Sequence, residues 1–527
     1  MSKFYEKVAY HDVEEDIQSQ KSVDRWIFGL LLIVIGFVPL IVMASVVEVQ
    51  SPLITNSSAL TSGLKGDLFT YYKALTLLII TVIACLMFLS KILFMNGEIR
   101  KTKLNYAIGT FAVVIVLSTI FSPNISIALD GQYNRSDGAI SWLCYLTLFF
   151  IAMNIEYPKK VVHYVAYALY PFVIINFCII TINFYGKDLL QYKWTQNWVS
   201  ALLPEGATIS EGSQLIGTLN QWNYMSGMFG IMTVLFLTWA VIDNSNVRRN
   251  INTLIGLISM AVMLMAMSAS GFFTFVCITP LIIWLAVKSI SKKKSFIALL
   301  VFFIASAFIL HFLSLKDPKV WDESVGFFVP LSNPYEQEQP LEDSTGMTEL
   351  KIPSIWNTST ALAAEKAFEL PVLPDQKWGP GTGRIYIWEK TLELVTKRPL
   401  MGYGLDTLVY QFPHDHIEAR GNLNEVTVVD KPHNIYVGVI YGTGIIGVVA
   451  FLGMILLSLK GTLLAIFRFN KSTGFIVTLC IAWLAFLIQA LFNDTSIGIT
   501  GPLFVIGGIT VGVLFKENQG KSLQVKG

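Results

Sequence analysis

Apolar residues gather in long runs along the chain, and polar connections separate these runs. Most runs approach the roughly 20 residues that cross a hydrocarbon core as an α-helix. The pattern therefore predicts an all-α polytopic membrane protein with about twelve transmembrane helices. The predicted spans are residues 26–47, 69–95, 104–121, 139–155, 161–184, 223–242, 251–268, 270–288, 295–314, 435–459, 474–491 and 496–515.

The composition supports this class of protein. Hydrophobic residues make up 54% of the chain and charged residues only 14%, whereas about a quarter of the residues in ordinary globular proteins are charged. A water-facing surface cannot be built from so few charges. The composition excludes a cytosolic enzyme, a secreted domain and a nucleic-acid binder, and it makes the lipid bilayer the surroundings of the chain.

Lysines and arginines are concentrated in alternate connections, and the connections between these hold few of them. By the positive-inside rule both termini are predicted to be cytoplasmic. The predicted organisation is a cytoplasmic N-terminal segment (1–25), nine helices (26–314), an extracytoplasmic loop (315–434), three helices (435–515) and a cytoplasmic tail (516–527).

The second half of the long outer loop contains a predicted amphipathic helix. The apolar residues Ile385, Trp388, Leu392 and Val395 recur at steps of three and four, and the helix should stop before Pro399. One apolar face would let this helix lie either on the outer membrane interface or on the transmembrane bundle.

Ionisable residues are scarce inside the predicted spans, where Lys73, His163 and His311 all lie near helix ends. A transporter or proton pump usually needs charged or polar groups near the midplane of the membrane. Any chemistry is therefore expected on the outer face, which holds three of the six histidines, His414, His416 and His433.

Arg384 ends the segment Gly381-Thr382-Gly383-Arg384, directly before the predicted amphipathic helix. Free N–H groups at a helix N-terminus and a guanidinium fork suit a diphosphate. The alternative is a capped surface helix with a solvated arginine.

His433 lies directly before the tenth predicted span, where its imidazole would hang at the membrane surface as a general base for a sugar hydroxyl. It could equally be a polar residue at a helix start. Because His414 and His416 have no third ligand motif beside them, we expect a polar loop there and no metal. Arg135 lies on the outer face against the charge bias, and its simpler role is a salt bridge to Asp130 or Asp137.

Several ordered segments together resemble the O-antigen ligase and O-antigen polymerase superfamily. They are Gly383-Arg384-Ile385-Tyr386-Ile387-Trp388, Arg398-Pro399-Leu400-Met401-Gly402-Tyr403-Gly404, His433-Asn434-Ile435-Tyr436 and Gly442-Thr443-Gly444-Ile445-Ile446-Gly447. The loop from Gly131 to Gly138 and the segment from Gly217 to Tyr224 are also similar to family segments. One difference is that many members carry a basic residue after a serine in a central span, where this chain has Ser268-Ala269-Ser270-Gly271.

The resemblance implies transfer of a glycan from a polyprenyl diphosphate carrier to a hydroxyl of a glycan or lipid acceptor, at the outer face of a bacterial cytoplasmic membrane. His433 and Arg384 are then the expected catalytic residues, and Arg135, Arg398 and Asn434 the expected substrate-binding residues. Direct displacement at the anomeric carbon would make the protein an inverting glycosyltransferase that needs no metal and no other cofactor.

Within the superfamily, a repeat-unit polymerase, a ligase that moves a finished glycan and a relative that glycosylates proteins all fit the sequence. A transporter or flippase of lipid-linked glycan is the alternative from another class. A non-catalytic assembly scaffold is a third possibility.

Overall fold

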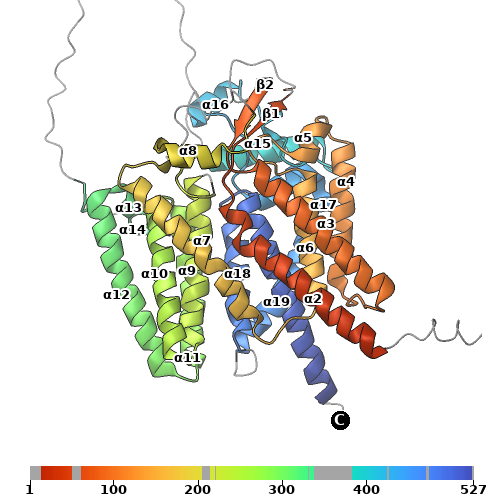
Figure 1. Ribbon diagram of the computed structural model, residues 1–527. Helices are drawn as coiled ribbons and strands as arrows, with labels where there is room; N and C mark the ends of the chain where they lie inside the picture. The colour runs from red at the N-terminus through yellow and green to blue at the C-terminus, as the bar shows by residue number, and fades with distance from the viewer. Residues whose placement is uncertain are drawn as a thin grey trace, which may run out of the picture.

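Long helices run between the two ends of the molecule, and short helices and a β-hairpin gather at one end (Figure 1). The structure is a computed structural model that describes residues 13–49, 51, 61–204, 214–219, 221–329, 332–336, 383–423, 427–469 and 474–524. The long helices are α2 (Val13–Gly36), α3 (Tyr71–Phe94), α4 (Lys103–Ile120), α6 (Ala139–Asn154), α7 (Val161–Phe184), α9 (Trp222–Ile242), α10 (Asn246–Met265), α11 (Ala269–Lys288), α12 (Lys292–Lys316), α17 (Ile435–Phe467), α18 (Ile476–Gln489) and α19 (Ile497–Gln524).

Each predicted span overlaps one of these helices. In the described part of the chain, nine of the helices are long and apolar enough to cross a membrane, and α6 and α18 are shorter apolar helices. The remaining helix, α10, carries Arg248 and Arg249 in its first turn. The prediction of a multi-pass, mainly helical membrane protein is therefore confirmed, while the number of twelve crossings stays a prediction.

The first predicted span is displaced. Its helix occupies Val13–Gly36 and continues as a short 3₁₀ turn, η1 (Val38–Leu40), instead of running to residue 47. The segment Ser45–Val49 forms strand β1, which pairs antiparallel with β2 (Gly63–Asp67), so Val47 faces Lys65 in the register. Pro39 marks the end of the helix, and three valines in five residues favour a strand. This hairpin adds β structure that the sequence prediction lacked.

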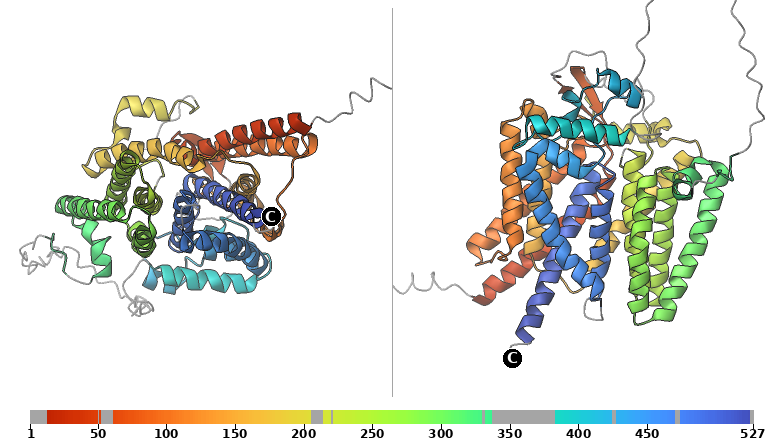
Figure 2. Two further views of the ribbon diagram at one scale, coloured as in Figure 1. Left: turned by 90° about the horizontal axis from the view of Figure 1, so that it is seen from below. Right: turned by 180° about the vertical axis from the view of Figure 1, so that it is seen from behind.

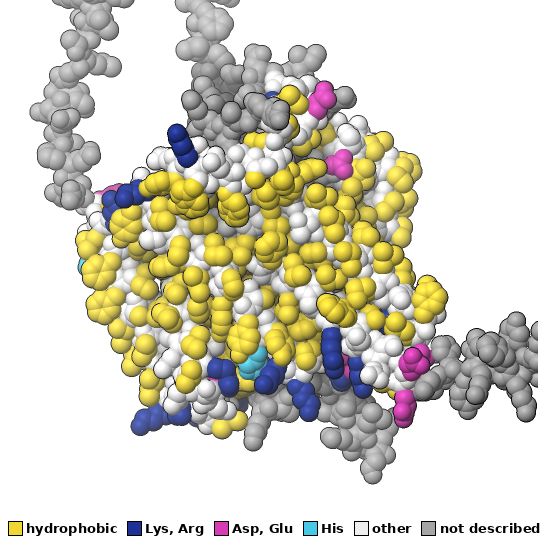
Figure 3. Space-filling model, in the orientation of Figure 1, with side chains coloured by type: hydrophobic (Ala, Val, Ile, Leu, Met, Phe, Trp, Pro, Cys, Tyr) yellow, Lys and Arg dark blue, Asp and Glu magenta, His cyan; other side chains and the backbone are white. Residues whose placement is uncertain are grey.

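The helices form two groups that share connecting members. Helices α9 to α12 pack together, and α2, α3, α6 and α19 form a second group with α4 and α17 beside it (Figure 2). Helix α7 joins the groups through contacts with α10 and α2, and α18 joins them through α9, α17 and α19. A broad hydrophobic belt covers the side of the bundle (Figure 3). This belt is the surface expected of a protein that faces lipid.

The elements at the end that carries the β-hairpin, which we call the outer end after the orientation predicted from the sequence, are short. They are α5 (Ile125–Asp130), η2 (Leu189–Gln191), α8 (Lys193–Val199), α13 (Lys319–Asp322), α14 (Val325–Phe328), α15 (Arg384–Lys397), η3 (Leu408–Tyr410) and α16 (Ile417–Asn422). The predicted amphipathic helix is confirmed as α15, which lies across the end of the bundle and packs on α17 (Figure 2).

The face that α15 buries differs from the predicted one. Ile385 and Leu392 are exposed, whereas Tyr386, Ile387 and Leu394 are buried. These buried side chains share a small apolar core with residues of the following loops and with α17. The helix therefore lies on the bundle, and the spacing of its apolar residues alone did not show which of them face inward.

Two glycine-containing segments of the resemblance pack against each other. Gly402 has φ of 66°, and a Cβ at this position would lie 2.3 Å from the carbonyl oxygen of Tyr441 on α17. Gly444, with φ of 68°, kinks α17 and accepts the Leu400 backbone at equally close range. Only glycine fits both the conformation and the space, so these motifs dock the outer loop onto α17.

Candidate active site

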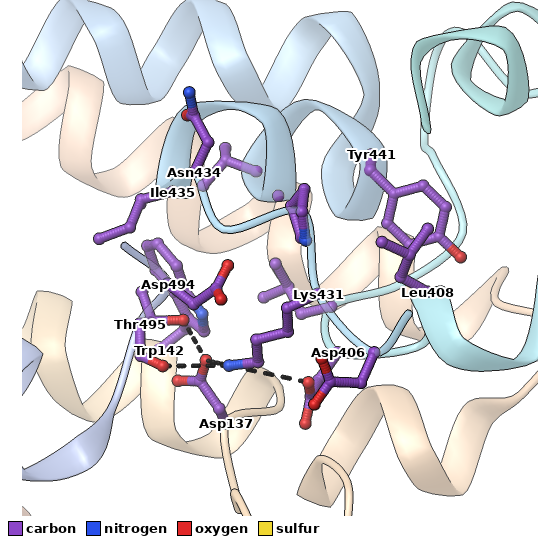
Figure 4. A pocket seen from close by; sticks show the side chains of 15 residues that line it. Asp137, Trp142, Asp406, Leu408, Lys431, Asn434, Ile435, Tyr441, Asp494 and Thr495 are labelled. Atoms are coloured by element: carbon purple, nitrogen blue, oxygen red, sulfur yellow. Dashed lines mark hydrogen bonds and ion pairs between the residues drawn. The ribbon is translucent and has the colours of Figure 1, made fainter. Parts of the chain in front are cut away.

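Four connections meet at the outer end of the bundle: residues 131–138, 398–407, 427–434 and 490–496. Lys431 lies at their centre, between Asp137 and Asp406 (Figure 4). Its ammonium group lies 2.7 Å from Asp137 Oδ2, 3.8 Å from Asp406 Oδ1 and 3.0 Å from the carbonyl oxygen of Thr495. Burial lowers the pKa of Lys431, but Asp137 and Asp406 outweigh burial and raise it. The lysine is therefore a charged cross-link between the connections.

Arg135 is held in the same network. Its Nε lies 3.0 Å from Asp406 Oδ1, and its Nη1 donates to Asp430. Burial lowers the pKa of Arg135, but the two carboxylates reverse this and raise the pKa. The expected alternative partners, Asp130 and Asp137, are wrong: the arginine pairs with residues far along the chain. The predicted role of Arg135 in substrate binding stays a prediction, and the contacts give its side chain a structural role.

His433 lies at the edge of this network with a partner of its own. Its Nδ1 is 2.7 Å from Asp494 Oδ2, and the imidazole is 33% exposed while the carboxylate is 4% exposed. This pairing leaves Nε2 as the ring nitrogen available to a ligand. Burial lowers the pKa of His433, but Asp494 outweighs burial and raises it. The carboxylate therefore both orients the imidazole and makes it a stronger base.

The backbone at His433 is fixed by its neighbours. The residue has φ of 52°, a left-handed conformation that costs a non-glycine residue about 1–2 kcal/mol. Trp388 Nε1 donates to the carbonyl oxygen of Pro432 at 2.6 Å, and Asn434 caps α17 on the other side. Strain of this kind persists where surrounding contacts over-determine the geometry, which is common at functional sites.

Arg384 begins α15, and its positive charge is near enough to oppose, in part, the rise in the pKa of His433. Its Nη1 donates to the carbonyl oxygen of Phe492 at 3.2 Å, while its buried Nε has no hydrogen-bond partner among the described residues. Within the described chain no carboxylate forms an ion pair with this guanidinium. Burial lowers the pKa of Arg384, an effect that Asp494 and Glu323 oppose, but a guanidinium stays charged. A positive charge without a paired anion thus lies next to the imidazole.

The other two candidates have different surroundings. Arg398 lies at the opposite end of α15, about 20 Å along the helix from Arg384. There it donates to the carbonyl oxygen of Phe121 at 3.1 Å and covers the ring of Tyr403. Asn434 accepts hydrogen bonds from the backbone N–H groups of Tyr436 and Val437, and its amide points away from Lys431 (Figure 4). The structure thus groups Arg384 with His433 and places Arg398 elsewhere.

Sequence reasoning missed Asp494 and Lys431. Asp494 lies in the short connection between α18 and α19, and Thr495 beside it donates to Asp137. A carboxylate in so short an outer connection, on the same face as the predicted base, was a signal that could have indicated a partner. Lys431 stands two residues before His433, and nothing in the sequence alone pairs it with Asp137.

The remaining predicted features have local explanations. His414 Nε2 accepts from the Val429 backbone N–H at 3.0 Å, and burial lowers the pKa of His414, as expected of a neutral loop residue. Of the proposed diphosphate cradle, Gly381 and Thr382 lie outside the described residues. Across the described ranges, no group of three or more His, Cys, Asp or Glu is placed to hold a metal ion.

The place where many relatives carry a basic residue lies at the start of α11. Here the backbone N–H of Ala269 donates to a carboxylate oxygen of Glu323 at 3.0 Å. The same carboxylate acts electrostatically on Arg384. The start of α11 is therefore linked to the candidate site through Glu323.

Comparison with known protein families identifies one domain in the chain. Residues 254–452 match the family model described as O-antigen ligase, a range that contains Arg384, Arg398, His433 and Asn434. No curated protein matches the chain significantly. Arg135 and Asp494 lie outside the matched range, so the network around His433 combines family and flanking segments. The match at residues 254–452, together with the helical membrane architecture, supports the O-antigen ligase and O-antigen polymerase superfamily.

Proposed function

We propose that this protein is a glycosyltransferase that moves a glycan from a polyprenyl diphosphate carrier to an acceptor hydroxyl at the outer face of the cytoplasmic membrane. The observation that carries the proposal is the pairing of His433 with Asp494 beside the unpaired charge of Arg384. An oriented base and a cation without a partner anion are the two groups that such a displacement needs.

The proposed reaction is a single displacement. The acceptor hydroxyl oxygen attacks the anomeric carbon and gives its proton to His433 Nε2. The bond from the anomeric carbon to the diphosphate oxygen breaks, and its electron pair leaves with the diphosphate. Arg384 stabilises the negative charge that develops there, and the imidazolium formed at His433 is stabilised by Asp494. Attack opposite to the leaving group inverts the anomeric carbon, and no step requires a metal.

The charge distribution supports the proposed side of the membrane. Lysines and arginines line the end of the bundle opposite to the candidate site (Figure 3). The first turn of α2 and the C-terminal end of α19 lie at that same end (Figure 1). Under the positive-inside rule this distribution supports a cytoplasmic position for that end and an outer position for His433.

The test is a transfer reaction with purified protein in lipid nanodiscs and a polyprenyl diphosphate-linked oligosaccharide. We expect His433→Ala to lower the transfer rate by about 10²–10⁴-fold, the usual contribution of a general base. The matched control is His416→Ala, because His416 is an exposed histidine of the same outer loop whose side chain does not cap α16. Product with the anomeric configuration retained would refute the single displacement.

A second measurement separates catalysis from transport and scaffolding. If His433→Ala keeps the wild-type transfer rate in nanodiscs, the imidazole is not the base and the proposal fails. If neither protein makes product but both move lipid-linked glycan between leaflets of a vesicle, the protein is a flippase.

A further inference from the structure

A large cavity in the outer half of the molecule lies apart from His433. It has a volume of about 600 Å³ and opens between β1, α3, α5 and α6. The cavity beside Lys431 has only about 40 Å³, room for little more than a water molecule. A substrate as large as a glycan therefore needs space outside the charged network, and the larger cavity offers it.

The lining of the cavity combines polar and apolar side chains. Glu48 on β1 and Asp130 at the end of α5 contribute carboxylates, and Leu75 and Leu78 on α3 contribute apolar surface. Both leucines are more than one third exposed, so the cavity is open along this part of α3. The lining of α3 begins at Tyr71 and reaches Leu78, a rise of about 10 Å along the helix.

The chemistry of the lining selects an uncharged ligand. None of the described residues that line the cavity is a lysine or arginine, and neither Glu48 nor Asp130 forms an ion pair within the described chain. A diphosphate would meet two carboxylates and no cation, which disfavours it strongly. Carboxylates and the amide of Gln132 instead accept and donate hydrogen bonds to hydroxyl groups, and the rings of Tyr71 and Tyr133 offer apolar faces.

One loop separates the cavity from the candidate active site. Gln132 and Ser136 line the cavity, while the next residue, Asp137, binds Lys431. The backbone N–H of Gln132 donates to Asp406 at 2.7 Å, and Tyr410 Oη donates to Gln132 Oε1 at 2.7 Å. A ligand in the cavity thus contacts the same loop that contributes Asp137 to the network beside His433.

The geometry points to a binding site for an uncharged, hydroxyl-rich glycan in this cavity, and this glycan is the acceptor of the transfer. The identification as acceptor rests on the proposed function; the preference for a neutral glycan rests only on the lining. Arg384 then serves the anionic donor, and the cavity serves the neutral acceptor, so the two substrates are recognised by separate chemistry.

Binding is tested without any transfer, by saturation-transfer NMR on the full chain in nanodiscs. The probes are maltotetraose, cellotetraose and tetra-N-acetylchitotetraose. We expect at least one probe to bind, and Leu75→Trp, which places a bulky ring in the lining of the cavity, to weaken its binding about tenfold or more. Glu48→Gln, which removes a charge from an exposed strand position, should weaken binding about threefold. The matched control is Leu86→Trp, at an exposed position of α3 that does not line the cavity.

The opposite results are equally definite. Three results would each overturn the inference. The first is that none of the three probes binds, and the second is that Leu75→Trp and Leu86→Trp bind a probe equally. The third is that farnesyl diphosphate displaces the probe. Displacement would show that the headgroup of the carrier, and not a neutral glycan, occupies the cavity.

The kinetic arm distinguishes this inference from the proposed function. In the transfer reaction Leu75→Trp should raise the KM of the acceptor about tenfold and leave the KM of the donor within about twofold. Transfer by the wild type without probe binding would leave the proposed function standing and remove the acceptor site. If the probe binds in a way that depends on Leu75 but the protein has no transfer activity, the glycan site stands and the proposed function fails.

Discussion

Two arginines of the outer face show opposite environments. Arg135 lies between Asp406 and Asp430, and its charge is matched by carboxylates of the protein itself. Arg384 has a backbone carbonyl as its hydrogen-bond partner, and in the described chain no carboxylate pairs with it. Both are partly buried cations beside the same connections, yet of the two only Arg384 retains a charge available for an anionic substrate.

The comparison teaches that the position of a cation does not by itself indicate phosphate binding. A buried arginine that already has two carboxylates would have to break those pairs to bind a diphosphate, and removing one partner of a buried pair is costly. The network around Arg135 and Lys431 therefore holds the outer connections together, and His433, Asp494 and Arg384 are left for the reaction. Four substitutions test this division.

The largest effect is expected from Arg135→Gln, as a loss of stability. Removing the guanidinium takes a partner from the buried Asp406 carboxylate and leaves the partly exposed Asp430 close to it, which should cost up to about 3–5 kcal/mol. The measurement is the midpoint of thermal unfolding of the purified protein, followed by the transfer rate of the molecules that remain folded. If the variant has normal stability and a raised KM for the donor, Arg135 binds substrate and is not mainly structural.

Arg384→Gln should affect catalysis and not folding. Loss of a group that stabilises transition-state charge typically costs about 2.7–4 kcal/mol in the barrier. The transfer rate should therefore fall by about 10²–10³-fold, while the thermal midpoint stays close to that of the wild type. Lys397→Gln, at an exposed position of the same helix, is the control and should keep its activity.

Asp494→Asn should shift the pH dependence of transfer. The base must be neutral, so activity rises with pH through the pKa of His433, which Asp494 raises. The variant lowers that pKa, and the acidic limb of kcat/KM should move to lower pH, with a rate loss of about tenfold from the weaker base. An unchanged acidic limb would show that another group titrates.

The same pair predicts a pH-dependent contribution to stability. Because the folded pKa of His433 is raised, the contribution is complete below the ordinary histidine pKa of about 6.5 and is lost as pH rises through the folded value. Thermal midpoints measured across this range should show the trend in the wild type and lack it in Asp494→Asn.

The smallest effect is expected from Asn434→Ala. The side chain caps α17 through two backbone N–H groups, and loss of such a cap costs about 1 kcal/mol. Thermal unfolding should register this change, while the KM values for donor and acceptor stay near those of the wild type. An increase in either KM without a change in stability would support the substrate-binding role predicted for Asn434.

The sequence predicts the helical framework well because the length and polarity of an apolar run directly reflect the thickness of a bilayer. It fails at the end of α2, where a valine-rich segment looks apolar enough for a span but pairs as β1. It also predicts helix α15 but not its buried face, because that face is selected by contacts with α17.

Some residues of the candidate site can be predicted from the sequence, and others cannot. His433 and Arg384 carry their chemistry in residue type and position, so they can be proposed from the chain alone. Asp494, Lys431 and Asp406 cannot, because ion pairs form between residues that are far apart in sequence: 61 positions separate His433 from Asp494, and 294 separate Asp137 from Lys431. Local spacing favoured neighbours as partners of Arg135, and the fold supplies distant ones.

The docking of Gly402 and Gly444 also limits how the outer segment can be exchanged between relatives. The apolar core under α15 includes Tyr441 of α17, so a fragment that ends at the start of α17 would leave that core without one wall. A chimera that grafts the outer segment of one relative onto the helices of another must therefore carry the first turns of α17 with it. The segment to exchange in such a chimera therefore includes the outer loop and the start of the following helix, and not the loop alone.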